Sequence, residues 1–196
     1  MRRMGNPDAD RYASSLSRSL GFARPPGASA LADRVWGRAS LGLVARGPAV
    51  RLVKRSARAW GLLLRESLPR RTQHYLVARE VAAFCLRADG VELSSAQVGV
   101  SLVLPVETFD DAIADGVEEA AADLELPLAA TALRRAELHR VPTAVVTPRW
   151  SRVRGDDRGR LPTDHATLRA LASPNVPVCG LRRTQTADGE TLIQVA

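Results

Sequence analysis

Several residue types are scarce in this sequence of 196 residues, and each scarcity argues against a class of protein. The two cysteines, Cys85 and Cys179, lie far apart and in no CxxC spacing, which argues against a zinc ribbon and against a disulfide framework. We expect each cysteine to be a small buried residue instead. The sequence has only three histidines, at positions 74, 139 and 165, so imidazole ligands for a metal are few.

Long apolar runs are absent as well. No stretch approaches the roughly 18 uninterrupted apolar residues of a membrane span, and the first ten residues, MRRMGNPDAD, contain no apolar signal core. The sequence also carries no nucleophile elbow, phosphate-binding loop or dinucleotide fingerprint. We therefore expect a cytoplasmic protein that does not associate with membranes.

The remaining composition is that of a globular protein, with 45% apolar and 25% charged residues. The length fits one domain, or one domain with a small appendage. Positive charge is concentrated at the start: residues 1–71 have a net charge of +11, residues 72–141 of −7 and residues 142–196 of +3. Nucleic acid is one possible partner of such a basic segment, because arginine forks suit phosphate oxygens.

The basic segment has a second interpretation. Lys54 is the only lysine in the chain, so the positive charge reflects a general use of arginine, and the basic segment could simply complement the acidic middle. If it does bind nucleic acid, the side chains that we expect to make the contacts are Arg51, Lys54, Arg55 and Arg58.

Periodicity and breaker residues predict the elements of the first 90 residues. Residues 1–8 are predicted to form a flexible arm. Ser29 is predicted to cap a short helix over 30–37. The predicted helices cover 9–20, 30–37 and 70–88, and the predicted strands cover 41–45, 49–53 and 59–65. We expect the three strands to form a small antiparallel sheet.

The last 56 residues read as a β-rich extension over 141–196. A strand is predicted at 141–148, a charged turn at 154–159, a helix at 164–172 and a hairpin around 187–189. Trp150 stands among arginines and could stack on a base. We expect it instead to anchor its turn onto the core, as such tryptophans more often do.

The helix over 70–88 contains a pattern of chemical interest, Arg79-Glu80-Val-Ala-Ala83. With histidines at its first and last positions it would read HExxH, in which two histidines share one helix face to bind zinc and the glutamate acts as general base. Here those positions hold Arg79, which has no lone pair to offer, and Ala83, which has no donor atom.

Three segments carry a resemblance beyond this pattern. Leu68-Pro69, a polar turn and YLVAREVAAFCL look like the ImmA/IrrE family of zinc metallopeptidases, and VELSSAQVGVSLVLPVETF at 91–109 is similar to that family's second signature. The segment 117–138 looks like the family's closing helix pair. The resemblance covers roughly residues 10–138 and implies an α+β domain of the zincin type over 9–140, made of several helices and a small sheet.

Carried over residue by residue, the resemblance places the family's three zinc ligands on Arg79, Ala83 and Ser94. Only Glu80, at the position of the general base, is retained. A catalytic zinc needs three protein ligands and an open position, so the resemblance implies a chain without metal, cofactor or catalytic activity. We expect Glu80 to be a vestigial carboxylate, ion-paired or hydrogen-bonded within the domain.

Active members of that family are associated with helix-turn-helix repressors. The resemblance therefore implies a pseudoprotease that acts by protein–protein binding, with a helix-turn-helix regulator as the expected partner. Two alternatives stay open: a nucleic-acid-associated protein that uses the basic N-terminal third, and a residual metal-dependent peptidase with a rearranged site.

Overall fold

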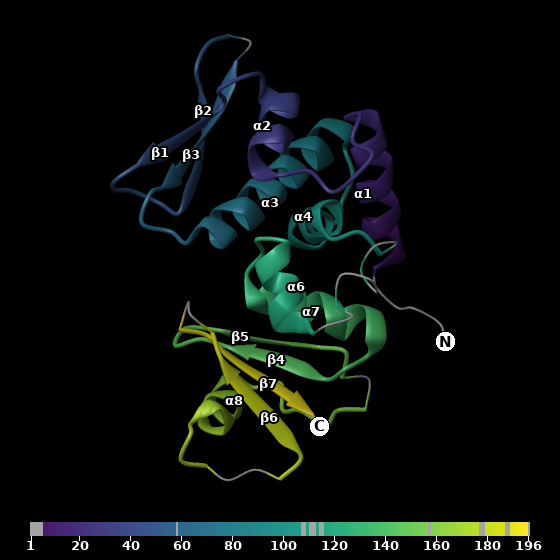
Figure 1. Ribbon diagram of the computed structural model, residues 1–196, viewed down its shortest axis with the longest axis vertical. Helices are drawn as coiled ribbons and strands as arrows, with labels where there is room; N and C mark the ends of the chain where they lie inside the picture. The colour runs from purple at the N-terminus through teal and green to yellow at the C-terminus, as the bar shows by residue number, and fades with distance from the viewer. Residues whose placement is uncertain are drawn as a thin grey trace. The chain divides into compact units, whose positions relative to one another are not determined.

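The computed structural model combines helices and two small sheets in an α+β architecture (Figure 1). It describes residues 6–57, 59–106, 109, 113, 116–156, 158–176, 179–186 and 189–195. The chain divides into two compact units. We call residues 6–114 with 123–127 the N-terminal unit, and residues 115–122 with 128–196 the C-terminal unit.

The N-terminal unit begins with helices α1 (Pro7–Ser19) and α2 (Ala28–Trp36). The side chain of Asn6 caps α1 by accepting hydrogen bonds from the amides of the next turn, and a proline follows directly. The expectation of a flexible arm over 1–8 is therefore wrong for residues 6–8, while residues 1–5 lie outside the described part. Ser29 does not cap α2, because the helix starts at Ala28, two residues before its predicted start, with Gly27 at its N-cap.

The first sheet contains β1 (Leu41–Val44), β2 (Val50–Lys54) and β3 (Trp60–Arg65), each within one residue or so of its predicted range. The strand order is β1-β3-β2, and β1 runs parallel to β3. The prediction of an all-antiparallel sheet is therefore wrong. Two successive reversals of the chain make the third strand parallel to the first, and β3 takes the centre because its leucines are the most deeply buried.

Two further helices of this unit are α3 (Arg70–Asp89) and α4 (Ser95–Val103). Gly90 ends α3 in the left-handed conformation, which glycine adopts more readily than other residues. Gly99 lets α4 approach closely, since a Cβ added there would lie 2.8 Å from the Cα of Arg79. The helices therefore pack through their backbones at this point.

The C-terminal unit starts with α6 (Val117–Asp123) and α7 (Leu128–His139). Strands β4 (Thr143–Val146) and β5 (Ser151–Arg154) follow, then α8 (His165–Ala172), β6 (Leu181–Gln185) and β7 (Thr191–Val195). The second sheet is antiparallel in the order β5-β4-β7-β6. The pairing of β6 with β7 confirms the predicted hairpin strands, although turn residues 187–188 lie outside the described part.

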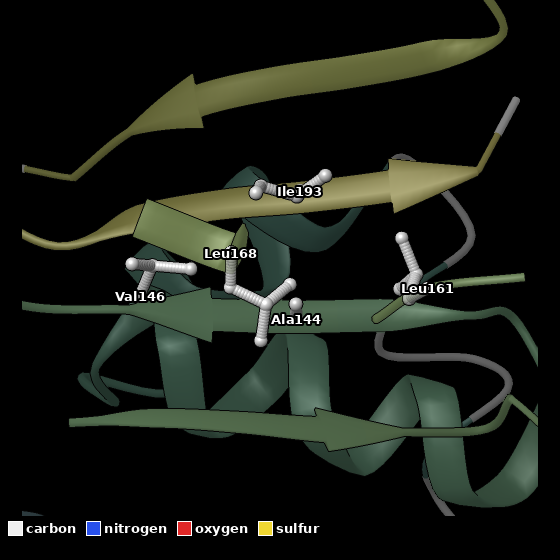
Figure 2. Packing of buried hydrophobic residues seen from close by; sticks show 5 residues of the cluster. All are labelled: Ala144, Val146, Leu161, Leu168 and Ile193. Carbon is white, nitrogen blue, oxygen red and sulfur yellow. The ribbon is translucent and has the colours of Figure 1, made fainter. Parts of the chain in front are cut away.

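Helices cover both faces of the second sheet. On one face Leu161 and Leu168 pack against alternate residues of the two central strands, which are Ala144, Val146 and Ile193 (Figure 2). On the other face α7 contributes Ala129 and Ala132 to a cluster with Val145 and Leu192. All four residues of β4 are buried for this reason.

Because of this packing, the boundary between the two units lies earlier in the chain than the sequence pattern predicts. The sequence pattern assigns residues 117–140 to the first domain, whereas α7 shares its core with the C-terminal sheet. Strand β5 is also absent from the sequence-based predictions, which treat its residues as an irregular segment and a charged turn. These residues form a strand because β4 pairs with them, and the local sequence carries no signal for that partner.

Two smaller expectations concern the burial of the cysteines and the absence of a membrane span. Cys85 is half-buried and Cys179 is exposed, so the expectation of two buried cysteines is wrong. Among the described residues, no helix has both the length and the apolar character needed to cross a membrane.

Candidate functional site

Arg79 and Glu80 form an ion pair on the middle of α3. The Nη2 of Arg79 donates to the Oε1 of Glu80 at 2.8 Å, and the Nε donates to the same oxygen at 3.3 Å. The two side chains are 34% and 21% exposed. Glu80 is thus ion-paired within the domain, and its partner is the neighbouring Arg79.

The surroundings of the pair are firmly packed. Val81 and Ala82, which follow the pair on α3, are fully buried. One turn after Glu80, Phe84 packs edge-on against Trp36 of α2 at 5.7 Å and against Trp60 of β3 at 6.3 Å between ring centroids. This aromatic contact joins two helices and the sheet, so the helix that carries the pair is fixed from several sides.

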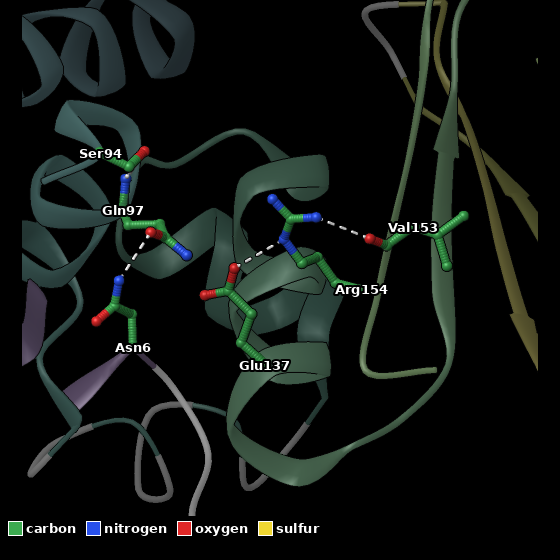
Figure 3. Close-up of polar contacts among 6 residues, drawn as sticks. All are labelled: Asn6, Ser94, Gln97, Glu137, Val153 and Arg154. Atoms are coloured by element: carbon green, nitrogen blue, oxygen red, sulfur yellow. Dashed lines mark hydrogen bonds and ion pairs between the residues drawn. The ribbon is translucent and has the colours of Figure 1, made fainter. Parts of the chain in front are cut away.

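Ser94 has a structural role. Its hydroxyl caps α4 by accepting a hydrogen bond from the amide of Gln97 (Figure 3). The side-chain oxygen of Gln97 in turn accepts from the Nδ2 of Asn6 at 3.3 Å. Ser94 and Gln97 have the spacing of a capping box, so the sequence does carry a signal for this cap, although the predictions above leave it out.

Metal ligands are sparse around these positions. In the described ranges, no group of three or more histidine, cysteine, aspartate or glutamate side chains is arranged to hold a metal ion. His74 lies on α3 near its start, and its Nε2 is 3.3 Å from the carbonyl oxygen of Pro26. Positions 79, 80 and 94 thus hold an ion pair and a helix cap, and none of them supplies an imidazole.

The basic residues of the first sheet fall into two kinds. Arg51 and Lys54 project from β2 and are exposed, as a phosphate-binding surface would require. Arg55 instead packs its side-chain stem over Gly61 and donates to the carbonyl oxygen of Ala39 at 2.8 Å. Arg55 therefore has a role in holding the sheet, and Arg58 lies outside the described residues.

Trp150 lies at the turn between β4 and β5 and is 46% exposed. The expectation that it anchors the turn onto the core is wrong. Backbone and hydroxyl contacts from Thr147 hold the turn instead, so the indole is not needed there. The alternative in which Trp150 contacts a partner gains support from this exposure.

Burial shifts the pKa of a nearby thiol. It raises the pKa of Cys85, and the charge of Asp89 raises it further. A thiol with a raised pKa is a poor nucleophile at neutral pH. Cys85 is therefore a packing residue and not a candidate for covalent catalysis.

No protein-family model matches this sequence, and no curated protein matches it. One solved structure, titled "Mycobacterium tuberculosis transcriptional regulator", is similar in fold. It has a TM-score of 0.55 and 13% sequence identity, over 96% of this chain and 87% of that chain. At this identity the likeness concerns the fold alone, and it extends over both units.

Proposed function

We propose that this chain is a catalytically inactive relative of the ImmA/IrrE metallopeptidases that acts by binding another protein, a helix-turn-helix regulator. The observation that supports this proposal most strongly is the Arg79–Glu80 ion pair, at 2.8 Å, on the helix where a zinc peptidase would hold its metal. A guanidinium at a metal-ligand position brings positive charge where a cation would sit, and it has no lone pair for coordination.

Two further observations support the same proposal. Ser94 is used as a helix cap, and Gly99 allows the close helix crossing behind Arg79, where the family has a small residue. The similar solved structure is titled as a transcriptional regulator, which agrees with a regulatory setting for a chain of this fold.

The catalytic part of the proposal can be tested by rebuilding the site. The triple variant Arg79→His, Ala83→His and Ser94→Glu supplies three ligand side chains. We expect it to bind about one zinc ion per chain, while the original protein binds none under the same conditions, as measured by isothermal titration and elemental analysis. Failure of the triple variant to bind zinc, although it is folded by circular dichroism, would contradict the zincin-type geometry.

The binding part needs a separate measurement. Helix-turn-helix regulators from the same cell would be purified, titrated with the chain by isothermal calorimetry and then weighed by intact mass spectrometry. We expect a complex with a dissociation constant at or below about 1 μM and a regulator of unchanged mass. Cleavage of the regulator would overturn the proposal of inactivity, and lack of binding to every regulator tested would overturn the proposed partner.

A further inference from the structure

The hairpin of β4 and β5 presents Trp150 on a rigid turn. The amide of Thr147 donates to the carbonyl oxygen of Trp150 at 2.9 Å, and the Thr147 hydroxyl donates to the same oxygen at 2.9 Å. The hydroxyl oxygen also accepts from the amides of Arg149, at 3.2 Å, and Trp150, at 3.0 Å. A turn closed by four such contacts has a fixed backbone, so exposure of the indole does not result from a frayed loop.

Arginines flank the exposed ring, and the segment from Thr147 to Arg154 contains no acidic residue. Arg149 precedes Trp150 and is exposed, and Arg152 follows it and is exposed as well. Arg154 is different, because its Nε donates to the Oε1 of Glu137 at 3.1 Å (Figure 3). The hairpin therefore offers two solvent-facing guanidinium groups beside one aromatic ring.

The strand geometry places the Trp150 ring and the Arg152 guanidinium on the same face of the sheet. Because the backbone of Trp150 pairs with Thr147, it continues the ladder in which Val146 faces Ser151 and Val145 faces Arg152. Side chains two residues apart along a strand point to the same face. The indole and the Arg152 guanidinium thus project from one face of an edge strand, about one strand repeat apart.

We propose that this hairpin binds single-stranded nucleic acid, with the Trp150 ring stacked on one base and Arg149 and Arg152 on the neighbouring phosphates. Proteins that bind single strands combine aromatic platforms with a positively charged track, because every base offers a π-face and every nucleotide a charge. A duplex keeps its bases stacked inside, so the exposed ring adds nothing to duplex binding. The exposed aromatic ring and the neighbouring positive charges together therefore indicate single-stranded nucleic acid as the class of partner.

The test uses the full chain and a fluorescein-labelled oligothymidine of about ten nucleotides, a length within the usual site sizes of such modules. Anisotropy titrations at about 50 mM salt should give saturable binding that weakens steeply as salt is raised. Trp150→Ala should weaken binding about tenfold, and Trp150→Phe, which keeps an aromatic ring, should weaken it about threefold or less. Arg149→Gln and Arg152→Gln should each reduce the salt slope by about one.

Arg169→Gln is the matched control, because Arg169 is an exposed arginine of the same unit on α8. We expect it to leave binding and salt slope unchanged. A second readout is the quenching of tryptophan fluorescence by the unlabelled oligonucleotide, which should be present in the original protein and absent in Trp150→Phe.

Absence of binding to the oligothymidine would overturn the proposal. Equal affinity for a duplex of the same length, with no effect of Trp150→Ala, would also overturn it and would move the contact to another basic surface such as that of Arg51 and Lys54. Neither result depends on the ion pair of Arg79 and Glu80, so this proposal and the proposed function can fail independently.

Discussion

The two sheets of this protein are built on different principles. In the first sheet β2 has no buried residue, with Arg51 and Lys54 exposed and Leu52 half-buried, whereas β3 carries the buried leucines. In the second sheet the central strand β4 is buried at every position, because α7 packs on one face and α8 on the other. The comparison teaches that short strands form a sheet with exposed charged residues in one unit and the middle layer of a three-layer core in the other.

The largest expected effect is in the three-layer core. Ile193→Ala removes a fully buried side chain from the cluster beneath α8, and we expect a loss of about 4 kcal/mol in the free energy of unfolding. Leu52→Ala in the first sheet removes a half-buried side chain and should cost about 1–2 kcal/mol. Urea unfolding followed by circular dichroism measures both. If Ile193→Ala lowered the free energy of unfolding no more than Leu52→Ala does, the proposed difference between the two sheets would be wrong.

The next effect concerns the helix crossing that supports the first sheet. Gly99→Ala places a Cβ 2.8 Å from the Cα and 2.9 Å from the amide nitrogen of Arg79, so α4 must move away from α3. We expect a loss of about 2 kcal/mol. The control is Gly27→Ala, where an added Cβ meets no atom within 4 Å and which should cost clearly less. Equal losses would show that the crossing adapts freely.

A polar contact joins α1 to the end of α3 in the N-terminal unit. The hydroxyl of Tyr12 donates to the Oδ2 of Asp89 at 2.6 Å. Burial, followed by this hydrogen bond, raises the pKa of Tyr12. The contribution of neutral Tyr12 is then fully present below the unfolded pKa of about 10 and is lost as pH rises through the folded value.

Tyr12→Phe tests this contact. We expect it to cost about 1 kcal/mol at neutral pH and to remove part of the decline in stability above about pH 10. Unfolding midpoints of both proteins between neutral and alkaline pH are the measurement. Parallel pH curves would assign the alkaline decline to other groups.

The smallest effect is expected at the cap of α8, on the outside of the C-terminal unit. The carboxylate of Asp164 accepts from the amide of Thr167 at 2.8 Å, and this backbone hydrogen bond is the main cause that lowers the pKa of Asp164. Its stabilisation is present above the unfolded pKa and is lost as pH falls through the lower folded value.

Asp164→Ala should therefore lower the urea midpoint slightly at neutral pH and have no effect at a pH below both pKa values. Asp164→Asn retains an acceptor for the Thr167 amide and serves as the control, with little change at neutral pH. An alanine variant as stable as the original protein at neutral pH would contradict the role of the cap.

Much of the fold could be predicted because its signals are local. Pro69 and Gly90 mark the ends of α3, and the hydrophobic runs mark the strands of the first sheet almost to the residue. The strand order could not be predicted, because it depends on which strand is the most buried. The predicted boundary between the domains was wrong for a similar reason. The small residues of α7 indicate a packed helix, but they do not identify Val145 and Leu192 as the residues on which the helix packs.

The candidate sites divide in the same way. That Glu80 is ion-paired could be predicted from a carboxylate on a packed helix, but its partner Arg79 could not, because adjacent residues of a helix do not share a face. The exposure of Trp150 could not, because it depends on the turn contacts of Thr147 and on how little of the ring the neighbouring elements cover. Ser94 lies between these cases, as its cap spacing is readable in the sequence.

The cap at Ser94 and the ion pair at Arg79 also limit how this chain can change over generations. A zinc ion would need ligands at three positions at once. A single exchange at Arg79 separates Glu80 from its partner, and a single exchange at Ser94 removes the cap of α4. Each single exchange thus loses a stabilising contact and supplies too few ligands for a metal ion, so we expect both positions to tolerate substitution poorly.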